Sequence, residues 1–515
     1  MAAFEIPETF NLGSFLTDRH VAEGRGSRVA IYYRDEKITY SELAAKVNRT
    51  GNALKDLGLE MENRMVMVLP DSPEFFYCFL GAMKIGAVPI AVNTLALPKD
   101  YAYFLNDSRA KILVVQESLL PKIEEVKKDL KYLKQIVVAG NAPAGYASFE
   151  NLIEKASDVL EPAPTSKDDV AFWMYTSGTT GVPKGVVHLH HDLLHFLPPY
   201  CESVSRITTD DIVFTTSRMF FSYGRNNSFD SPLLYGAGVV LYPDWPDTAK
   251  VFEIVQKYRP TIFVSVPSFY AAMLRELDKN DRKLDFSFIR VCASSGEPLP
   301  KPIFDRWKER FGLEILDVLG STDAGGSYLG NCPGLVKPGS AGILLDGFEG
   351  RLVGADGKEV TTGEIGTLWL KNDGTAPYYW NKHQRSKQVF QGEWFNTGDR
   401  FHKDEDGFMW YEGREDEMLK VSGQWVSPLE IEAALGQHPA VSEVAVVGAP
   451  DDSGLTRVKA FVVLKDGDKA SPELEKEMIG FVRDRIAHFK APRWVEFVPE
   501  MPRTATGKIQ RHRLH

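Results

Sequence analysis

The chain has 515 residues, of which 43% are apolar, 25% charged and 11% aromatic, so it can bury a large core and is not a disordered polypeptide. Lysine and arginine total 60 against 70 acidic residues, and the net charge of −10 argues against nucleic acid as a partner. The four cysteines lack Cys-x-x-Cys spacing, which argues against a disulfide framework or a zinc knuckle and fits a reducing cytoplasm.

The N-terminal residues show neither the basic start nor the apolar run of a secretory signal. The most apolar long stretch, residues 77–97, is interrupted by Lys84, Pro89 and Asn93, so we expect no membrane span. A cytoplasmic location is therefore the expectation.

Strand-like runs alternate with helical patterns along the first 300 residues, as is typical of stacked α/β layers. Residues 39–42 fit a capping box and predict a helix whose apolar face carries Leu43, Val47, Leu54 and Leu57. Strands are predicted at residues 64–69, 111–115, 135–139, 212–216, 238–242, 262–266 and 289–293.

A further helix is predicted at 248–258, because Pro260 ends it. From about Gly413 the pattern becomes a short αβ cycle, with helices at 428–435 and 471–486 and strands at 443–447 and 458–464. The sequence thus predicts an α/β fold in two parts. The first is a large multilayered N-terminal domain of β-sheets with flanking helices, residues 1–415, and the second is a small α+β C-terminal domain, residues 416–515.

The strongest motif is the run Thr-Ser-Gly-Thr-Thr-Gly-Val-Pro-Lys-Gly at 176–185, directly after a strand-like segment. Its glycines let backbone amides approach an anion, its hydroxyls add donors, and Lys184 adds a positive charge. It is not a Walker loop, because Lys184 lies between Pro183 and Gly185. The interpretations are a polyphosphate site or a Gly/Thr surface turn. Its members are Thr176, Ser177, Gly178, Thr179, Thr180, Gly181 and Lys184.

Five further motifs follow in a fixed order: Gly-Ser-Thr-Asp at 320–323, Gly-Glu-Ile-Gly at 363–366, Trp-Phe-Asn-Thr-Gly-Asp at 394–399, Gly-Arg-Glu-Asp at 413–416 and Pro-Arg-Thr-Ala-Thr-Gly-Lys at 502–508. Over nearly its whole length the sequence resembles the adenylate-forming (ANL) superfamily of acyl-CoA and aryl-CoA synthetases, luciferases and peptide-synthetase adenylation domains. The segments 221–224 and 420–428 are most similar to the benzoate-CoA ligase group.

This resemblance implies a two-step reaction. A carboxylate attacks the α-phosphate of ATP, pyrophosphate leaves, and the acyl-adenylate then acylates coenzyme A, with Mg²⁺ offsetting the phosphate charge. By the family's pattern Lys508 bridges carboxylate and phosphate, and Thr322 touches the α-phosphate. Asp399 accepts hydrogen bonds from the ribose hydroxyls, and Arg414 contacts ribose or phosphate. The remaining nucleotide-site residues are Ser295, Gly296, Glu297, Pro298 and Asp317.

The resemblance also implies a metal ligand, a hinge and a channel. Asp323 stands where the family usually has a glutamate that holds magnesium, and its shorter side chain implies a shifted or water-bridged metal. Asp416 matches the hinge about which a mobile C-terminal domain turns between the half-reactions. Lys420, Gly423 and Trp425 are expected beside the channel for coenzyme A, although Gly423 also suits a simple turn.

The acyl pocket is expected between residues 220–227 and 319–329. Gly320 stands where acetate-activating relatives place a tryptophan. The segment 324–327 replaces larger residues of the benzoate-ligase pattern, including a histidine, and Gly326 is expected to leave space for the acyl group, so an enlarged cavity is expected. Arg225 either meets a polar substrate group or forms a structural ion pair. The pocket residues are Phe221, Tyr223, Gly224, Arg225, Gly320, Gly325, Gly326 and Ser327.

The expected substrate is an aromatic or similarly sized carboxylic acid. The alternatives are branched, hydroxylated or medium-chain aliphatic acids, transfer of the acyl group to a carrier protein or an amine, and a catalytically silent ATP sensor. The sequence leaves the oligomeric state open, with a homodimer as one option.

Overall fold

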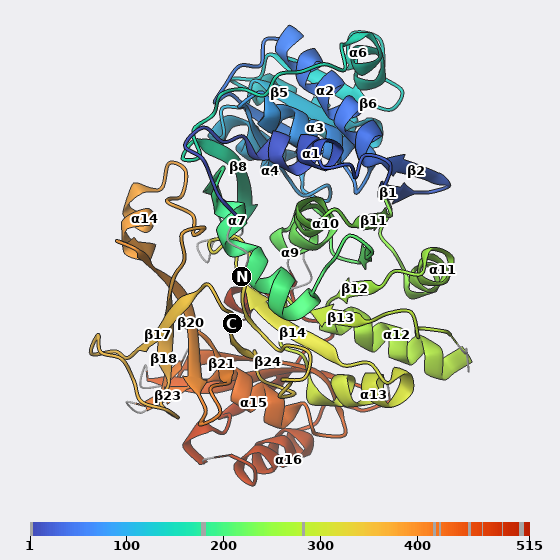
Figure 1. Ribbon diagram of the computed structural model, residues 1–515. Helices are drawn as coiled ribbons and strands as arrows, with labels where there is room; N and C mark the ends of the chain where they lie inside the picture. Colours follow the sequence, from blue (N-terminus) through green and yellow to red (C-terminus); the bar gives the residue numbers. More distant parts are fainter. Residues whose placement is uncertain are drawn as a thin grey trace. The chain divides into compact units, whose positions relative to one another are not determined.

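The computed structural model of the protein describes residues 4–176, 182–280, 284–415, 419–421, 424–451, 455–465, 467–486, 488–503 and 509–514. They form two compact units, of which the larger comprises Met1–Gly350 and Leu370–Asn396 and the smaller comprises Arg351–Trp369 and Thr397–His515. Figure 1 shows sheets flanked by helices in both. The expected α/β class, with a large N-terminal and a small C-terminal part, is confirmed, while the 415/416 boundary stays a prediction.

The first sheet of the larger unit has seven strands in the order β7-β6-β5-β3-β4-β8-β9. All neighbours are parallel except β8 and β9, which pair antiparallel and place Thr176 opposite Lys184. The strands are β3 Arg64–Val68, β4 Val88–Ala91, β5 Ile112–Gln116, β6 Gln135–Ala139, β7 Ala147–Ser148, β8 Val170–Thr176 and β9 Lys184–Leu189.

The second sheet has nine strands in the order β16-β15-β14-β13-β12-β10-β11-β1-β2. Its centre is parallel and both ends are antiparallel. The strands are β1 Val29–Tyr33, β2 Glu36–Thr39, β10 Ile212–Thr215, β11 Gly238–Leu241, β12 Ile262–Ser265, β13 Val291–Ser294, β14 Ile315–Gly320, β15 Ser327–Gly330 and β16 Ile343–Leu344.

Helices cover both sheets. They are α1 Leu12–Ala22, α2 Tyr40–Asp56, α3 Pro73–Lys84, α4 Pro98–Asp107, α5 Leu120–Glu124, α6 Phe149–Lys155, α7 Asp192–Phe196, α8 Pro198–Tyr200, α9 Ser222–Arg225, α10 Ser231–Tyr235, α11 Thr248–Tyr258, α12 Pro267–Asn280, α13 Lys301–Phe311 and α14 His383–Val389. Two 3₁₀ turns, η1 Glu117–Leu119 and η2 Lys127–Asp129, and two π-helical segments, η3 Cys201–Ser205 and η4 Asn226–Asp230, complete the helical elements described in this unit. No helix of the described ranges is long and apolar enough to cross a membrane.

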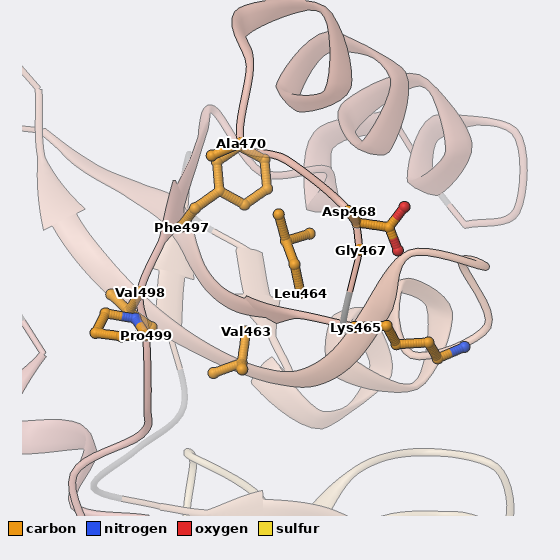
Figure 2. Close-up of a pocket in the computed structure, with 9 residues that line it drawn as sticks. All are labelled: Val463, Leu464, Lys465, Gly467, Asp468, Ala470, Phe497, Val498 and Pro499. Atoms are coloured by element: carbon orange, nitrogen blue, oxygen red, sulfur yellow. The ribbon is translucent and has the colours of Figure 1, made fainter.

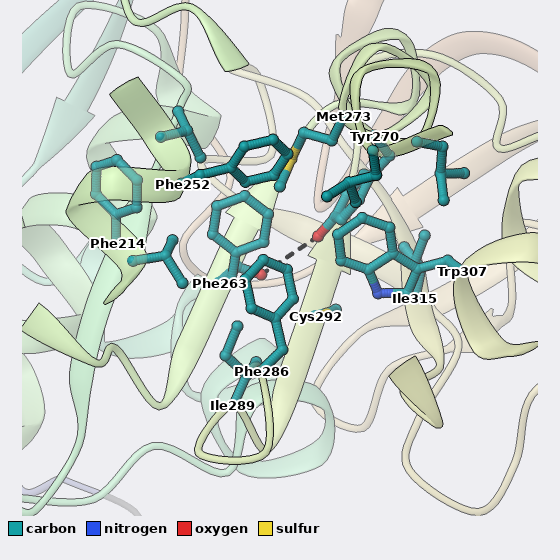
Figure 3. Packing of buried hydrophobic residues seen from close by; sticks show 14 of the residues in the cluster. Phe214, Phe252, Phe263, Tyr270, Met273, Phe286, Ile289, Cys292, Trp307 and Ile315 are labelled. Carbon is teal, nitrogen blue, oxygen red and sulfur yellow. Dashed lines mark hydrogen bonds between the residues drawn. The ribbon is translucent and has the colours of Figure 1, made fainter. Parts of the chain in front are cut away.

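The core beneath α11, α12 and α13 is aromatic (Figure 3). Phe252, Phe263 and Tyr270 are fully buried, and the ring of Trp307 lies 4.8 Å from that of Tyr270. The Tyr270 hydroxyl donates to the carbonyl oxygen of Ala293 at 3.0 Å, so its buried polar end is satisfied. Each such side chain stabilises the fold by about 2 kcal/mol through burial, and this fixes the strands that carry the site.

A further sheet joins β17 Glu349–Val353, β18 Gly366–Lys371, β19 Phe390–Gln391, β20 Trp394–Lys403 and β21 Met409–Arg414. The smaller unit also contains β22 Leu419–Val421, β23 Gln424–Val426, α15 Pro428–Leu435, β24 Val441–Pro450, β25 Thr456–Leu464, α16 Pro472–Arg483, η5 His488–Lys490, β26 Trp494–Phe497 and η6 Arg511–Arg513. A hollow of about 380 Å³ lies at the end of β25 (Figure 2). Its lining is Val463, Leu464, Lys465, Gly467, Asp468, Ala470, Phe497, Val498 and Pro499.

The predicted elements are all present, with shifts at their ends. The capping box joins Thr39 and Glu42, and the helix 248–258 has the expected bounds. Leu43, Val47 and Leu54 are buried, whereas Leu57 lies just past the helix and is half-buried. The strand expected at 289–293 runs from Val291 to Ser294, and the helix expected to reach 486 ends at Arg483.

Candidate active site

Lys184, Asp323 and Tyr379 meet at one point of the larger unit. Lys184 begins β9, Asp323 follows β14, and Tyr379 precedes α14. The Lys184 Nζ lies 3.1 Å from Asp323 Oδ1 and 3.8 Å from the centre of the Tyr379 ring. The Tyr379 hydroxyl donates to the same carboxylate oxygen. The expected phosphate-binding lysine and the expected metal ligand are therefore an ion pair, with an aromatic residue that holds both.

The carboxyl group of Asp323 is kept ionised by these neighbours. Burial alone would raise its pKa, but the charge of Lys184 and the hydrogen bonds from Tyr379 and Lys184 bring the pKa below its ordinary value. No group of three or more His, Cys, Asp or Glu side chains converges on a metal position among the described residues. One ionised carboxylate suits magnesium, which commonly binds through one or two carboxylates and substrate phosphates.

Three side chains from other elements hold the turn at residues 321–326. The His188 ring bonds through Nε2 to the carbonyl oxygen of Thr322 at 2.8 Å. The Ser222 hydroxyl lies 3.4 Å from the Thr322 hydroxyl. Asn226 donates through Nδ2 to the carbonyl oxygen of Gly325 at 2.8 Å. Thr322 is thus placed by β9 and by the α9–η4 segment.

A buried carboxylate, Asp192, anchors the histidine behind that turn. His188 Nδ1 lies 2.9 Å from Asp192 Oδ2, and both side chains are almost wholly enclosed. His191 Nε2 lies 3.0 Å from Asp192 Oδ1. The His188 ring thus links the buried carboxylate of Asp192 to the turn that carries Thr322.

Arg225 forms a structural ion pair, the second of the two alternatives that the sequence left open. Its Nε donates to Asp230 Oδ2 at 2.8 Å, and the side chain is 1% exposed. The guanidinium carbon lies 3.9 Å from the centre of the Phe172 ring. Asp230 and Phe172 hold the guanidinium inside the fold, and its buried Nη1 has no hydrogen-bond partner among the described residues. Contact between Arg225 and a polar substrate group stays a prediction.

Three residues that precede Arg225 also belong to the expected acyl pocket. Phe221 and Tyr223 are half-buried, and the Tyr223 hydroxyl lies 3.5 Å from the carbonyl oxygen of Ser265. Gly224 is required by a close approach, since a Cβ there would lie 2.1 Å from the carbonyl oxygen of Arg218. Tyr223 therefore remains a candidate wall, while Gly224 serves local packing.

The glycines of the 320–327 segment face protein atoms. A Cβ on Gly320 would lie 2.4 Å from the Gly326 carbonyl oxygen, and one on Gly326 would lie 3.0 Å from a ring carbon of Phe196. Gly325 has φ +77°, which favours glycine. Ser327 begins β15 and is half-buried. The room expected beside Gly326 is therefore occupied by Phe196, and an enlarged cavity at this point is not supported.

The expected adenine-side residues follow β13 and lie in β14. Ser295 is buried, Glu297 is half-buried, Pro298 is exposed and Gly296 has φ +90°. Asp317 accepts from the Leu299 amide at 3.3 Å, and among the described residues its enclosed Oδ1 has no hydrogen-bond partner. Burial raises the pKa of Asp317 well above its ordinary value. A buried acceptor of this kind suits an amino group on a ligand.

In the smaller unit Asp399 and Arg414 lie opposite each other on β20 and β21. Arg414 Nη1 donates to Asp399 Oδ1 at 3.0 Å and to the carbonyl oxygen of Thr397 at 2.8 Å. The Tyr411 hydroxyl lies 3.5 Å from the same carboxylate oxygen. The two residues expected at the ribose are therefore neighbours.

Two family models match long stretches of this chain. A model of the AMP-binding enzyme family matches residues 18–380, and a model of the AMP-binding enzyme C-terminal domain matches residues 430–508. This chain belongs to the AMP-binding enzyme family. The resemblance expected from the motifs is confirmed.

Among family members, a benzoate–CoA ligase of Thauera aromatica is 42% identical over 99% of this chain and 97% of its own length. A 4-hydroxybenzoate–CoA/benzoate–CoA ligase of Rhodopseudomonas palustris is 40% identical over 98% and 94%. The crystal structure of the anthranilate CoA ligase AuaEII in complex with anthranoyl-AMP has a TM-score of 0.91, with 38% identity over 100% of this chain and 98% of that one. A benzoate CoA ligase from Burkholderia xenovorans LB400 gives 0.88, with 37% identity over 98% and 99%.

Several expected family residues lie outside the described residues, and their roles stay predictions. They are Ser177, Gly178, Thr179, Thr180, Gly181, Asp416, Gly423 and Lys508. Lys420 and Trp425 are opposite each other in the β22–β23 hairpin, and only their backbone is described.

Three contributors were missed from the sequence, Phe196, His188 and Tyr379, while Asn226 falls within the expected pocket segment 220–227 but was not singled out. A weak signal exists for two of them, since His188 opens a histidine-rich run and Tyr379 stands in a Tyr-Tyr-Trp triplet. In the sequence alone, Phe196 is typical of a core residue and Asn226 of a turn residue. Their contacts with residues 322–326 become visible only when the chain is folded.

Proposed function

We propose that this chain is an ATP-dependent, AMP-forming ligase that joins an aromatic carboxylic acid to coenzyme A. The observation that carries the proposal is the Lys184–Asp323 ion pair beside Thr322, in a chain 42% identical throughout to a benzoate–CoA ligase. The same arrangement of lysine, hydroxyl and carboxylate answers the main physical difficulty of the reaction, which is bringing a carboxylate anion to a polyphosphate.

In the first half-reaction Thr322 and Lys184 bind phosphate oxygens, while the backbone around residues 176–184 supplies amide donors. Asp323 orients Lys184 and would hold magnesium, which would offset the charge of the phosphates when bound. His188 fixes the carbonyl of Thr322, so that the hydroxyl stays aimed while charge develops. Asp399 accepts hydrogen bonds from the ribose hydroxyls, and Arg414 holds the Asp399 carboxylate in place. Asp317 accepts a hydrogen bond from the adenine base.

The second half-reaction transfers the acyl group from the adenylate to the thiol of coenzyme A. Lys508 is needed only while carboxylate meets phosphate, so it acts in the first step. A turn of the C-terminal domain about Asp416 would replace Lys508 by the channel residues Lys420, Gly423 and Trp425. This exchange explains how one site serves two reactions with conflicting requirements.

An aromatic acid is favoured because the relatives named above act on benzoate, hydroxybenzoate and anthranilate. Phe221 and Tyr223 offer half-buried aromatic walls that suit a flat ring. Branched, hydroxylated or medium-chain aliphatic acids are the second candidate class, and acyl transfer to a carrier protein or an amine is the second candidate reaction.

The deciding experiment measures pyrophosphate release from ATP with a panel of aromatic and aliphatic acids, with and without coenzyme A. We expect AMP, pyrophosphate and an aryl thioester with benzoate, hydroxybenzoates or aminobenzoates. Pyrophosphate release that coenzyme A does not convert to a thioester would favour transfer to a carrier or an amine. If the protein binds ATP but releases no pyrophosphate with any acid, the result would favour a catalytically silent ATP sensor.

A further inference from the structure

Two carboxylates lie on either side of the His191 ring, at the start of α7. The ring Nδ1 lies 3.1 Å from Asp168 Oδ1, and the ring Nε2 lies 3.0 Å from Asp192 Oδ1. The backbone of His191 is fixed as well, because its amide donates to the carbonyl oxygen of Lys167 at 3.1 Å. His191 therefore joins the segment before β8 to the first residue of α7.

The two carboxylates differ in their exposure to solvent. The Asp168 side chain is 61% exposed and that of His191 17%, whereas that of Asp192 is 0% exposed. Apart from the His191 ring, no donor reaches Asp192 Oδ1 among the described residues. A buried carboxylate without a positive partner is unfavourable. His191, which touches solvent, is thus the group that can place a titratable positive charge beside Asp192.

From Asp192 the contacts continue to the turn of Thr322. The second carboxylate oxygen, Oδ2, accepts from the Leu189 amide at 3.0 Å and lies 2.9 Å from His188 Nδ1. His188 Nε2 lies 2.8 Å from the carbonyl oxygen of Thr322. An unbroken series of side-chain contacts therefore runs from a surface carboxylate to the residue that precedes Asp323.

The charge of the His191 ring depends on the groups around it. The titratable groups that face it are Asp168 before β8, Asp192 and His195 in α7, and the adjacent His190. The contact with Asp192, supported by the charge of Asp168, raises the pKa of His191 above its ordinary value of 6.5, although partial burial opposes this. Burial lowers the pKa of His190 to about 3, so His190 is neutral there. Around neutral pH the charge that can change is that of His191.

We propose that His191 is a positioning residue for the first half-reaction and acts on the turn of Thr322 through Asp192 and His188. The inference rests on the proposed ligase function, in which Thr322 contacts the α-phosphate. A charged His191 balances the Asp192 carboxylate, which then holds His188 and the turn in place. When His191 loses its proton, the buried carboxylate lacks its outer counter-charge and the hold on the turn weakens. Adenylation should therefore slow as the pH rises through the pKa of His191.

The first test compares His191→Gln with His195→Gln. His195 is a matched control on the same helix, with its ring centre 5.6 Å from that of His191. Burial lowers the pKa of His195 despite the charge of Asp373, so it is neutral where His191 is charged. We measure single-turnover pyrophosphate release with benzoate between pH 6 and pH 9, and thioester formation from added benzoyl-adenylate.

His191→Gln should slow pyrophosphate release roughly tenfold at pH 6, through kcat more than through the KM for ATP. It should also remove the part of the alkaline loss of rate that belongs to His191. Thioester formation from added adenylate should keep its wild-type rate, which general damage to the fold would not allow. His195→Gln should keep both the rates and the pH profile.

Two further variants shift the pH profile in opposite directions. His191→Lys carries a positive charge throughout this range, so it should restore pyrophosphate release to within a few-fold of wild type and extend it to higher pH. Asp168→Asn removes the outer carboxylate, which lowers the pKa of His191, so the loss of rate should begin at lower pH. Asp168 is mostly exposed, so Asp168→Asn carries the test if His191→Gln fails to fold.

A measurement that needs no activity follows the His188 ring. In protein with ¹³C-labelled histidine, the NMR signal of His188 should shift with the same midpoint as that of His191, since Asp192 contacts both rings. This shift should be absent in His191→Gln and present in His195→Gln.

The outcomes separate the inference from the function on which it rests. A wild-type protein that releases no pyrophosphate with any acid would refute the ligase proposal and with it any role in adenylation, whereas the His188 signal would still report on the contact series. An active wild type whose pH profile is unchanged in His191→Gln would overturn the inference, even if the variant is less stable, because the contact would then be structural only. A His188 signal that does not follow His191 would overturn it as well.

Discussion

The imidazole of His188 reaches the carbonyl oxygen of Thr322 across 134 positions of sequence, at 2.8 Å. Its other nitrogen is bonded to the buried carboxylate of Asp192 at 2.9 Å. The backbone of the residue whose hydroxyl is expected to touch the α-phosphate is thereby linked to a buried carboxylate. Since neither His188 nor Asp192 reaches the surface, this tie does not compete with water.

The first prediction concerns how much the hydrogen bonds of His188 stabilise the folded protein. Replacement of His188 by Asn removes at least one of its two buried hydrogen bonds and leaves a buried acceptor without its donor, which should lower the unfolding free energy by about 3 kcal/mol. Urea unfolding measures the loss. The control is His402→Asn, which removes a more exposed contact with Glu412 and should cost less than about 1 kcal/mol. Equal losses in the two variants would mean that the buried hydrogen bonds of His188 do not stabilise the fold.

A second prediction addresses the metal role of Asp323. Asp323→Asn removes the negative charge, so the Mg²⁺ concentration for half-maximal pyrophosphate release should rise by roughly tenfold. Tyr379→Phe keeps the carboxylate and serves as the control, because only a hydrogen bond to Oδ1 is lost. The same Mg²⁺ dependence in Asp323→Asn and wild type would exclude Asp323 as a ligand.

A third prediction follows from His190, whose pKa burial lowers to about 3. Between that value and an unfolded pKa near 6.5 the unfolded chain binds more protons, so this histidine destabilises the fold as the pH falls below 6.5. The cost at pH 5.5 should be about 1 kcal/mol. His190→Asn should remove this part of the pH dependence, measured by urea unfolding at pH 7 and pH 5.5.

The contribution of His190 is obtained from the difference in unfolding free energy between wild type and His190→Asn. The pH dependence of the wild type alone also contains contributions from other groups. Burial raises the pKa of Asp71 to about 6 despite the charge of Arg218, so the folded state holds this proton more tightly and Asp71 acts with the opposite sign. A difference between wild type and His190→Asn that does not grow toward low pH would contradict the buried neutral histidine.

A fourth prediction separates the half-reactions through Lys508. Lys508→Ala should slow adenylate formation by about a hundredfold, by analogy with the loss of one donor aimed at the transition state. Added acyl-adenylate should still be converted to thioester. Lys465→Ala, which removes a lysine beside the hollow of Figure 2, should change neither step. Adenylation at the wild-type rate without Lys508 would refute its role.

A fifth prediction tests the hinge. Asp416→Pro fixes φ and removes a backbone donor, so it should restrict rotation and impair one half-reaction far more than the other. Single-turnover measurements of each step decide this, and circular dichroism checks the fold. Equal losses in both steps would indicate general damage instead of a blocked domain rotation.

The sequence predicted which helices and strands are present better than it predicted the residues at which they begin and end. The strand expected from Ile289 starts at Val291, because Ile289 closes a turn on the carbonyl of Phe286 before pairing begins. The helix expected to reach residue 486 ends at Arg483, where Arg485 and Ile486 bond back to Val482 in a final turn. Apolar periodicity continues through both turns, so it does not mark where regular hydrogen bonding stops.

Site residues that belong to a sequence motif could be predicted. Site residues that are placed only by tertiary packing could not. Thr322, Asp323 and Lys184 could be named from local residue order. Tyr379 could not, because its bond to Asp323 depends on how distant segments are brought together. Phe196 was hidden for a related reason, since the empty volume that glycines imply can be filled by a ring from elsewhere in the chain.

The Asp399–Arg414 pair also bears on how ATP approaches a protein whose net charge is −10. Asp399 carries a cation 3.0 Å away, and Asp323 in the larger unit has Lys184 at 3.1 Å. These two carboxylates are therefore locally neutralised at a distance far below the Debye length of about 8 Å at physiological salt. The incoming polyanion meets dipoles rather than bare negative charges, so the association rate of ATP should vary with ionic strength less than the net charge alone implies.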